Sequence, residues 1–402
     1  MTESRELPPL TVASKTRDTL AHATRHKNRK KFDEFLIVDV DAHVRETLFW
    51  EEVTDRIDSD VWRYNAKSFK ERGGAAGLSN AQPGLTYQDL FGRVPHGMAL
   101  KEKIESAQHP QVALARYAMD AMGIDYMTVF PTPMLTLGLH PQPEVEVELG
   151  RAYNRWLTEL VLPQDKGLLG LLYLPFNSPE ACAPMVEEFG AKPGVIGFTV
   201  TSTRHRPVHH NGYMRLYAAL EERGLPLAFH AGLNWEDGSM AQLNRFLSMH
   251  ALSFVHCNLV HMANWVVNGL PERFPKLKVI WIESGLAWVP YLMQRLDSEY
   301  MMRTSEAPLL KRKPSEYMKE MYYSSQPIEL HHRKLVESTF EAINAETQLM
   351  YASDWPHWDF DTPSTIYDLP FLNEKQKRNI LGGNAARVFN LKDPYQAKAA
   401  AE

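Results

Sequence analysis

The sequence predicts an α/β protein, a (β/α)8 TIM barrel with a long insertion after strand 1 and an N-terminal extension. Short apolar segments alternate with amphipathic helical segments such as 211–224 and 288–302. Alternating strands and helices are typical of a parallel sheet, and eight such units favour a closed barrel. The predicted strands are residues 35–41, 125–131, 167–175, 194–200, 225–232, 277–284, 320–326 and 348–354.

The competing arrangement is an open, doubly wound sheet. Folds of that type usually carry a glycine-rich phosphate loop after the first strand. Here the first strand runs into "DVDAHVRET" (39–47), which contains no glycine. The barrel is therefore the preferred interpretation.

The composition is that of an ordinary globular protein, with 402 residues of which 44% are hydrophobic and 23% charged. A net charge of −5 and a pI near 6.4 give no reason to expect nucleic acid or a membrane surface as partner. No apolar run reaches the roughly 18 residues of a spanning helix, and the N-terminus lacks the apolar core of a secretory signal. Two cysteines, Cys182 and Cys257, make no disulfide framework, so we expect a cytoplasmic protein.

The chain divides into a barrel over residues 34–392 and segments that do not fit its repeat. Residues 1–33 form a basic extension that either wraps the surface or a partner subunit, or remains a solvated arm. Residues 47–108 follow the first strand, where the active-site loops of a barrel emerge, so they are a candidate lid; an inert oligomerisation loop is the alternative. Residues 393–402 are a C-terminal tail.

The first strand carries polar side chains at a spacing of two. In "FLIVDVDAHVRE" (35–46), Asp39, Asp41 and His43 follow four apolar residues. Residues two apart in a strand point to the same face, so these three are expected to share one face that ends at the mouth of the barrel. Buried polar groups are costly unless they are paired or bound to a cation. The pattern therefore indicates a metal site.

Other predicted strands also end in residues of the metal-ligand type. His230 ends strand five, Glu283 ends strand six, and Asp354 ends strand eight with His357 just beyond it. Each feature alone is explained as well by a helix cap or by a hydrogen-bonded core histidine. Their coincidence at one rim favours a bound ion.

These segments together resemble the amidohydrolase superfamily, in particular the branch of aminocarboxymuconate-semialdehyde decarboxylase and related TIM-barrel metal-dependent hydrolases. The resemblance covers most of residues 34–392. It implies a divalent metal held by Asp41, His43, His230 and Asp354. The segments that carry it are "DVDAH" (39–43), "MDAMGIDYMTVFP" (119–131), "LAFHAG" (227–232), "GLPERFPKLKVIWIESGLAWVPYLMQRLD" (269–297), "MYASDWPHWD" (350–359) and "NILGGNAARVFNL" (379–391).

The sequence departs from the family pattern at two strands. The family usually has a histidine in the sixth strand, where this chain has Glu283, which can serve as acid or base or bind metal directly. Dinuclear relatives often use a carboxylated lysine in strand four, and "GFTVTS" (197–202) contains no lysine. This pattern favours a single ion.

A second group of histidines leaves a dinuclear site open. The segment "MHALSFVHCNLVHMANW" (249–265) contains His256 and His261. His261, Glu283 and Glu46 are candidates for a second metal site, although helix histidines that face loops or an interface explain the segment as well. Some relatives of this branch are dinuclear iron or manganese–iron oxygenases, so an oxygenase (hydroxylase) component is the alternative function.

The main functional hypothesis is a metal-dependent hydrolase or non-oxidative decarboxylase of a small carboxylic or aromatic acid. Mixed nitrogen and oxygen ligands suit zinc, manganese or iron. Asp354, Glu283 and His357 are the candidates for proton transfer with metal-activated water.

Predicted substrate contacts and partners complete the expectations. Arg45 and His256 are candidates to hold an acidic substituent, and Gln326 lies at the rim of strand seven. A homo-oligomer or a related barrel subunit is the expected partner, and an inactive barrel that supports an active partner is a further alternative. Four tryptophans predicted to flank the ligands suggest a partly apolar pocket: Trp235, Trp288, Trp355 and Trp358.

Overall fold

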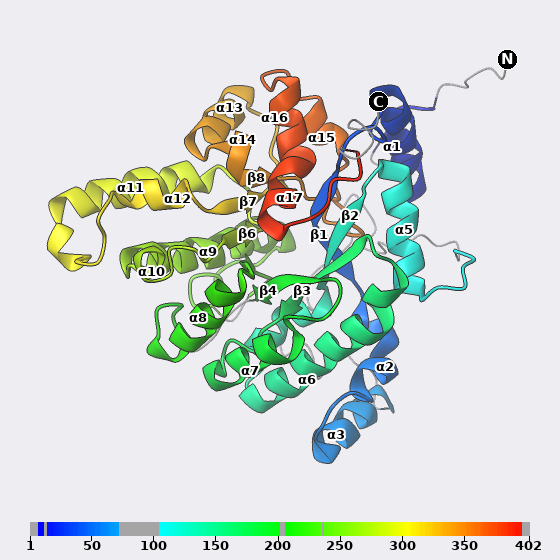
Figure 1. The fold of residues 1–402 in the computed structure, drawn as a ribbon, viewed down its shortest axis with the longest axis horizontal. Coiled ribbons are helices and arrows are strands. Elements are labelled where there is room, and N and C mark those ends of the chain that lie inside the picture. The colour runs from blue at the N-terminus through cyan, green and yellow to red at the C-terminus, as the bar shows by residue number, and fades with distance from the viewer. Residues whose placement is uncertain (1–6, 12–13, 72–103, 202–205, 235–236, 396–402) are drawn as a thin grey trace.

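The predicted barrel is confirmed. A computed structural model describes residues 7–11, 14–71, 104–201, 206–234 and 237–395. In this part of the chain the strands form one eight-stranded parallel sheet in sequence order, and backbone hydrogen bonds from Val40 to Tyr351 and from Asp354 to Asp41 connect the two edges (Figure 1). The strands are β1 (Val38–Val44), β2 (Tyr126–Pro131), β3 (Leu168–Tyr173), β4 (Val195–Val200), β5 (Leu227–His230), β6 (Val279–Ile282), β7 (Tyr322–Ser324) and β8 (Leu349–Met350).

Helices follow the strands and cover the outside of the barrel (Figure 1). The predicted helix at 288–302 is found with those bounds, whereas the one at 211–224 begins with a 3-10 turn over Asn211–Tyr213. The helices are α1 (Thr16–Lys30), α2 (Trp50–Thr54), α3 (Asp60–Glu71), α5 (Pro110–Met122), α6 (Pro143–Trp156), α7 (Pro179–Phe189), α8 (Met214–Arg223), α9 (Phe246–Val267), α10 (Leu270–Arg273), α11 (Trp288–Met302), α12 (Pro314–Met318), α13 (Arg333–Ala342), α14 (Ala345–Gln348), α15 (Ser364–Tyr367), α16 (Glu374–Arg378) and α17 (Asn384–Phe389).

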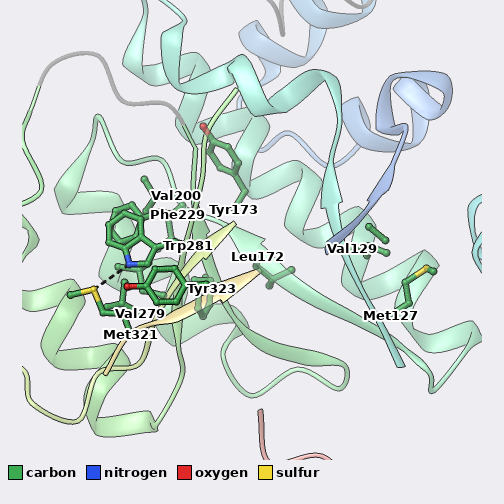
Figure 2. Packing of buried hydrophobic residues seen from close by; sticks show 14 of the residues in the cluster. Met127, Val129, Leu172, Tyr173, Val200, Phe229, Val279, Trp281, Met321 and Tyr323 are labelled. Atoms are coloured by element: carbon green, nitrogen blue, oxygen red, sulfur yellow. Dashed lines mark hydrogen bonds between the residues drawn. The ribbon is translucent and has the colours of Figure 1, made fainter. Parts of the chain in front are cut away.

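The strands separate two apolar layers, because successive side chains point to opposite faces. Ala228 belongs to the cluster inside the barrel, and the next residue, Phe229, packs in the layer between sheet and helices. In that outer layer the rings of Phe229 and Trp281 stack at 4.7 Å, and Trp281 Nε1 donates to Met321 Sδ at 3.2 Å (Figure 2). The outer layer thus fixes the strands whose inner faces carry the site.

The last helical segment seals the entry end of the barrel. The π-helical turn Asn379–Gly383 leads into α17, which contributes to the inner cluster with Ala385, Val388 and Phe389. A Cβ at Gly382 would overlap the carbonyl oxygen of Leu36, so this position requires glycine for the close approach to β1. The segment 379–389 therefore has a structural role in closing the barrel.

The N-terminal extension packs on its own barrel. Helix α1 lies beside α5, with Leu20 and Ala23 buried, and Lys30 Nζ pairs with Asp368 at 2.6 Å (Figure 1). At the other end, Tyr395 Oη donates to Asp125 Oδ1 at 3.1 Å. None of the described helices combines the length and apolar character that crossing a membrane requires.

The insertion at 47–108 is described only in part. Its helix α2 lies beside α6, where Trp156 Nε1 donates to Glu52 Oε2 at 2.8 Å, and Arg56 Nε pairs with Glu159 at 2.9 Å; helix α3 packs against α2. Residues 72–103 lie outside the described residues. A lid role for this insertion therefore stays a prediction.

Candidate metal centre

Two histidines at the exit of the barrel present their Nε2 atoms to each other. His43 lies near the end of β1 and His230 ends β5. The Nδ1 atom of His43 lies 2.9 Å from the carbonyl oxygen of Pro131, and that of His230 lies 2.8 Å from the carbonyl oxygen of Ala231. Because a carbonyl oxygen only accepts, each Nδ1 carries a proton and each neutral ring keeps a lone pair on Nε2. The two Nε2 atoms are 3.3 Å apart, a geometry that suits a shared cation.

Three buried carboxylates surround this pair of nitrogens. Asp41 Oδ1 lies 3.5 Å from both Nε2 atoms, Glu283 Oε2 lies 3.1 Å from His230 Nε2, and Asp354 Oδ1 lies 3.1 Å from His43 Nε2. Among the described residues, both oxygens of Asp41, Glu283 Oε2 and Asp354 Oδ2 have no hydrogen-bond partner. An uncompensated buried carboxylate costs several kcal/mol, on the order of what a paired cation restores. The ligand atoms form two overlapping groups, each within 4.8 Å: Asp41, His43, His230 and Glu283, and His43, Glu283, Asp354 and His357. This set of donors fits a divalent cation.

The electrostatics of the cluster favour positive charge at its centre. Burial by itself lowers the pKa of His230, but the charges of Asp41 and Glu283 outweigh it and raise that pKa to about 9. The same balance, with Asp354 as the main partner, raises the pKa of His43 well above its usual range. Burial and the charge of Glu283 raise the pKa of Asp354. The cluster thus attracts protons, and a bound metal ion would take their place.

Local backbone geometry aims two of the carboxylates inward. Glu283 follows β6 with φ of 47°, and Asp354 follows β8 with φ of 62°. Residues other than glycine seldom adopt this left-handed region, and such strained positions cluster at functional sites. Hydrogen bonds hold both turns: Asp354 N donates to Asp41 O at 2.7 Å and Glu283 N to Ser324 Oγ at 3.0 Å. The strands therefore end earlier than predicted, because the chain turns to present these side chains.

A bulge in β1 corrects the prediction that Asp39, Asp41 and His43 share one face. The pairing with β2 shifts between Asp39 and Ala42, so that Val40 and Asp41 together oppose one residue of β2. Asp39 is aligned with Met127, which packs in the outer layer, and its side chain is not among the clustered ligand atoms.

Asp39 instead supports the site by hydrogen bonding. Asp39 Oδ1 accepts from Asp41 N at 3.1 Å and from Ser353 N at 2.8 Å, and Ser353 Oγ donates to Asp39 Oδ2. These bonds join β1 to the segment that presents Asp354. Asp39 thus orients Asp41 and the segment that carries Asp354.

His357 is coupled to the edge of the cluster. Its Nδ1 lies 2.6 Å from Asp354 Oδ1, and its ring stacks on His43 with centroids 4.1 Å apart. Its Nε2 lies 3.4 Å from Thr132 Oγ1. Burial, with the nearby charge of His43, lowers the pKa of His357 to about 3, so the ring is neutral near pH 7. Asp354 and His357 can thus hold one proton between them.

A small cavity opens beside Glu283 and His357. Its volume is about 210 Å³, below the roughly 300–1,000 Å³ of pockets for drug-sized ligands, which favours a small substrate. Its wall is partly apolar (Pro133, Leu135, Leu233, Phe246, Phe254 and Trp358) and partly polar (Thr132, Thr136, His250, Glu283, His357 and Asp359).

The sequence profile of the amidohydrolase family matches residues 106–391, more than half of the chain. The chain belongs to the amidohydrolase family. A curated relative is the γ-resorcylate decarboxylase of Rhodococcus jostii (strain RHA1), which is 22% identical over 264 residues that span 62% of this chain and 79% of the relative. The predicted family and the prediction of an enzyme are thus confirmed.

Solved structures of similar fold include other decarboxylases. The 5-carboxyvanillate decarboxylase of Sphingomonas paucimobilis superposes with a TM-score of 0.63 at 20% identity, covering 89% of this amidohydrolase and 99% of that chain. A dihydroxybenzoic acid decarboxylase from Polaromonas sp. JS666, solved with bound manganese and the inhibitor 2-nitroresorcinol, gives a TM-score of 0.62 at 18% identity and covers 89% and 97%. At these identities the likeness establishes the fold.

The structure does not assemble the predicted second metal site. In the described part of this amidohydrolase, the clustered ligand groups include Glu283 but neither Glu46 nor His261. Glu46 accepts from Thr132 N at 3.1 Å and Met134 N at 2.8 Å, so it anchors the loop after β2. His261 packs 5.5 Å from the ring of Phe229, which belongs to the outer layer. The part of α9 that carries His261 thus packs against the outer face of β5, so His261 does not reach the inner face that carries His230.

The predicted substrate contacts lie mostly away from the cavity. His256 bonds Ser239 Oγ at 2.9 Å and lines a different cavity, together with His261. Arg45 and Gln326 are absent from the described lining, although Arg45 Nε and Gln326 Oε1 are buried without a hydrogen-bond partner among the described residues. Trp235 lies outside the described residues.

Of the other tryptophans, only one meets the cavity in the described part of the chain. Trp358 lines it, whereas Trp288 donates to Gly285 O at 3.1 Å and Trp355 packs 5.0 Å from Phe360. The prediction of a partly apolar wall is confirmed, but by Phe246 and Phe254 as much as by tryptophan. Adjacency in sequence to a ligand does not fix where a large ring packs.

Four polar lining residues had not been identified as site residues from the sequence: Thr132, Thr136, His250 and Asp359. Asp359 ends the segment "DWPHWD" (354–359). Its position shortly after Asp354 and His357 is the feature of the sequence from which it could have been predicted. The position of His250 in the cavity was not predictable, because its distance from the mouth of the barrel depends on the loop that leads into α9.

Proposed function

We propose that this chain is a metal-dependent, non-oxidative decarboxylase of a small aromatic acid. The observation that carries the proposal is the group of buried carboxylate oxygens without hydrogen-bond donors around two facing imidazole nitrogens. The small, partly aromatic cavity beside them supports a ring-bearing substrate. Relatives named as decarboxylases of aromatic acids, one of them with bound manganese, support the same conclusion.

Asp41, His43, His230 and Asp354 would hold the ion, with Glu283 beside it. A bound divalent ion acts as a Lewis acid that withdraws electron density from substrate oxygens. Mixed nitrogen and oxygen donors suit manganese, zinc or iron. One ion is the expected number, because the described groups of ligand atoms share His43 and Glu283 and so surround one region.

In decarboxylation the bond between the ring carbon and the carboxylate breaks. Carbon dioxide leaves, and the electron pair stays on the ring carbon, which then takes up a proton. Asp354 and His357, with 2.6 Å between Oδ1 and Nδ1, can hold that proton at the edge of the cavity. Glu283 faces the same cavity and is the second candidate for proton transfer.

Hydrolysis is the second candidate, favoured by one observation. Glu283 stands at the rim where a general base could act on water, and its carboxylate oxygen Oε2 has no hydrogen-bond partner among the described residues. A hydrolase would use the same ligands but release an acid and an amine or alcohol instead of carbon dioxide.

The test is an assay of the metal-depleted protein before and after addition of Mn²⁺. With 2,6-dihydroxybenzoate and related phenolic acids, we expect carbon dioxide and the ring product in equal amounts, no oxygen uptake and about one ion per chain. His230→Ala should remove both the ion and the activity. Release of an amine or alcohol from an amide or ester would favour hydrolysis. Two ions per chain including iron, with oxygen consumption, would refute the proposal in favour of an oxygenase.

A further inference from the structure

One acidic side chain of the cavity belongs neither to the metal cluster nor to the pair that holds the proton. Asp359 lies on the segment after β8 and lines the cavity together with Glu283 and His357. Burial and the charges of Asp354 and Glu283 raise the pKa of its carboxyl group to about 7, whereas the charges of His250 and His357 lower it. Within the described residues, no group donates a hydrogen bond to it. Asp359 is therefore an acceptor that a ligand can satisfy.

The wall near Asp359 is aromatic. The ring of His250 lies 5.4 Å from Phe246, 5.5 Å from Phe254 and 5.6 Å from Trp358, measured between centroids. All four residues line the cavity. Aromatic side chains of this kind pack well against another aromatic ring. The polar substituents of a bound ring would then contact the polar groups of the cavity. A bound aromatic ring would thus place one of its substituents near the acidic side chain.

Among the described lining residues of the cavity, acidic side chains outnumber basic ones that carry a permanent charge. Glu283 and Asp359 contribute carboxylates, whereas the lining residues that the structure describes include neither lysine nor arginine. A cation held at the metal cluster would match one substrate carboxylate. A second carboxylate would approach Asp359, and no lysine or arginine of the described lining would offset the repulsion. Like charges brought together in a binding site cost several kcal/mol, on the order of a hundredfold in affinity or more.

We propose that Asp359 determines substrate specificity by accepting a hydrogen bond from the ligand. The substrate is then an aromatic monocarboxylic acid with a hydroxyl or amino donor on the ring, and a ring with a second carboxylate is rejected. This inference rests on the proposed function for the reaction itself, but it concerns binding and can be measured without turnover.

The experiment compares ring ligands that differ in one substituent. Isothermal titration calorimetry of the full chain loaded with Mn²⁺, at pH 8, gives the Kd values of 3-hydroxybenzoate, 3-aminobenzoate and isophthalate. For the unaltered protein we expect the hydroxyl and amino ligands to bind at least about tenfold more tightly than isophthalate. Asp359→Asn should reduce this ratio to within about threefold, mainly because isophthalate binds more tightly.

A matched control is available two residues further along the chain. Asp361 is also acidic and largely enclosed, and accepts from Thr365 Oγ1 at 3.2 Å, but it does not line the cavity. Asp361→Asn should leave the ratio unchanged. Asp359→Ser is a second variant without the charge, in case Asp359→Asn fails to fold, and should narrow the ratio in the same way.

The outcomes separate this inference from the proposed function. The inference is overturned if isophthalate binds the unaltered protein as tightly as 3-hydroxybenzoate, if none of the ligands binds, or if the Asp359 variants keep the original ratio. Carbon dioxide release is measured separately. If the binding preference depends on Asp359 but no acid is decarboxylated, only the proposed function fails.

Discussion

Asp39 and Asp41 lie two residues apart in β1 and are both 0% exposed, yet their surroundings differ completely. Asp39 accepts hydrogen bonds from Asp41 N, Ser353 N and Ser353 Oγ. Asp41 has no hydrogen-bond donor among the described residues and lies close to two imidazoles and the carboxylate of Glu283. The carboxylate of Asp39 has its hydrogen-bond donors within the protein, whereas the carboxylate of Asp41 has none among the described residues and is suited to bind a cation.

The comparison shows how one strand serves structure and chemistry. The inner cluster below the site, which includes Val38 and Val40, is apolar and closely packed. Above it the same barrel gathers unsatisfied oxygens and strained backbone at Glu283 and Asp354. Active sites often retain such unfavourable arrangements because function requires them, at a cost in stability.

The largest effect is expected when Asp41 loses its charge. Asp41→Asn removes one anionic ligand and should lower kcat/KM for the decarboxylated acid by about 10³-fold, because a metal ion supplies several kcal/mol of transition-state stabilisation. Steady-state assays at saturating Mn²⁺ check this. Activity within about tenfold of the unaltered protein would show that Asp41 is not a ligand.

A comparable change at Asp39 should affect folding first. Asp39→Ala leaves three buried donors unpaired and should lower the free energy of unfolding by about 3 kcal/mol. Urea unfolding of the metal-free protein measures it, with Asp41→Asn as the matched variant. Asp41→Asn should cost less in the metal-free state, because Asp41 has no hydrogen-bond donor among the described residues to leave unpaired and loses only its attraction to His43 and His230. A destabilisation of equal size in both variants would remove the distinction between the two aspartates.

Metal addition should stabilise the protein only where the cluster is intact. At a free Mn²⁺ concentration one hundred times its Kd, binding adds about 2.7 kcal/mol to the free energy of unfolding. Thermal unfolding with and without Mn²⁺ should show this gain in the unaltered protein and lose it in Asp41→Asn. An equal gain in thermal stability in the unaltered protein and in Asp41→Asn would show that the ion binds elsewhere.

His261 tests whether a buried polar atom without a hydrogen-bond partner among the described residues is necessarily a metal ligand. Its Nε2 is such an atom, but His261 is not among the clustered ligand groups. Burial lowers the pKa of His261 from 6.5 to about 4. Because the folded-state pKa is depressed, its contribution to stability is complete above pH 6.5 and is lost as the pH falls towards 4. The loss is about 2 kcal/mol by pH 5.

His261→Leu should remove this part of the pH dependence and leave metal content unchanged. Urea unfolding of both proteins at pH 7.5 and pH 5 measures the pH dependence, and elemental analysis measures the metal. Loss of an ion in His261→Leu would restore the predicted second metal site and with it the oxygenase alternative.

Much of this architecture is visible in the sequence, for physical reasons. The alternation of apolar strands and amphipathic helices predicted the barrel, and the polar residues at strand ends predicted that Asp41, His43, His230, Glu283 and Asp354 would meet. The bulge at Val40 and Asp41 was not predictable, since a period of two assumes regular pairing. It moved Asp39 out of the expected face.

The missed and misplaced residues have a common cause. His261 and His250 both lie on α9, about three helical turns apart and on nearly the same helix face, so their positions along the helix axis decide which of them meets the cavity. Asp359 and Trp355 lie on the irregular segment after β8, where no periodicity indicates a direction. Residues that a strand carries were placed correctly far more often than residues carried by a helix or loop.

The most direct test of the central claim is a crystal structure of the protein grown with Mn²⁺, with diffraction data collected on both sides of the manganese absorption edge. The account predicts one anomalous peak within bonding distance of Asp41, His43, His230 and Asp354, and no peak in crystals of Asp41→Asn. A peak held by Glu46 and His261 instead, or no peak at the facing nitrogens of His43 and His230, would contradict it.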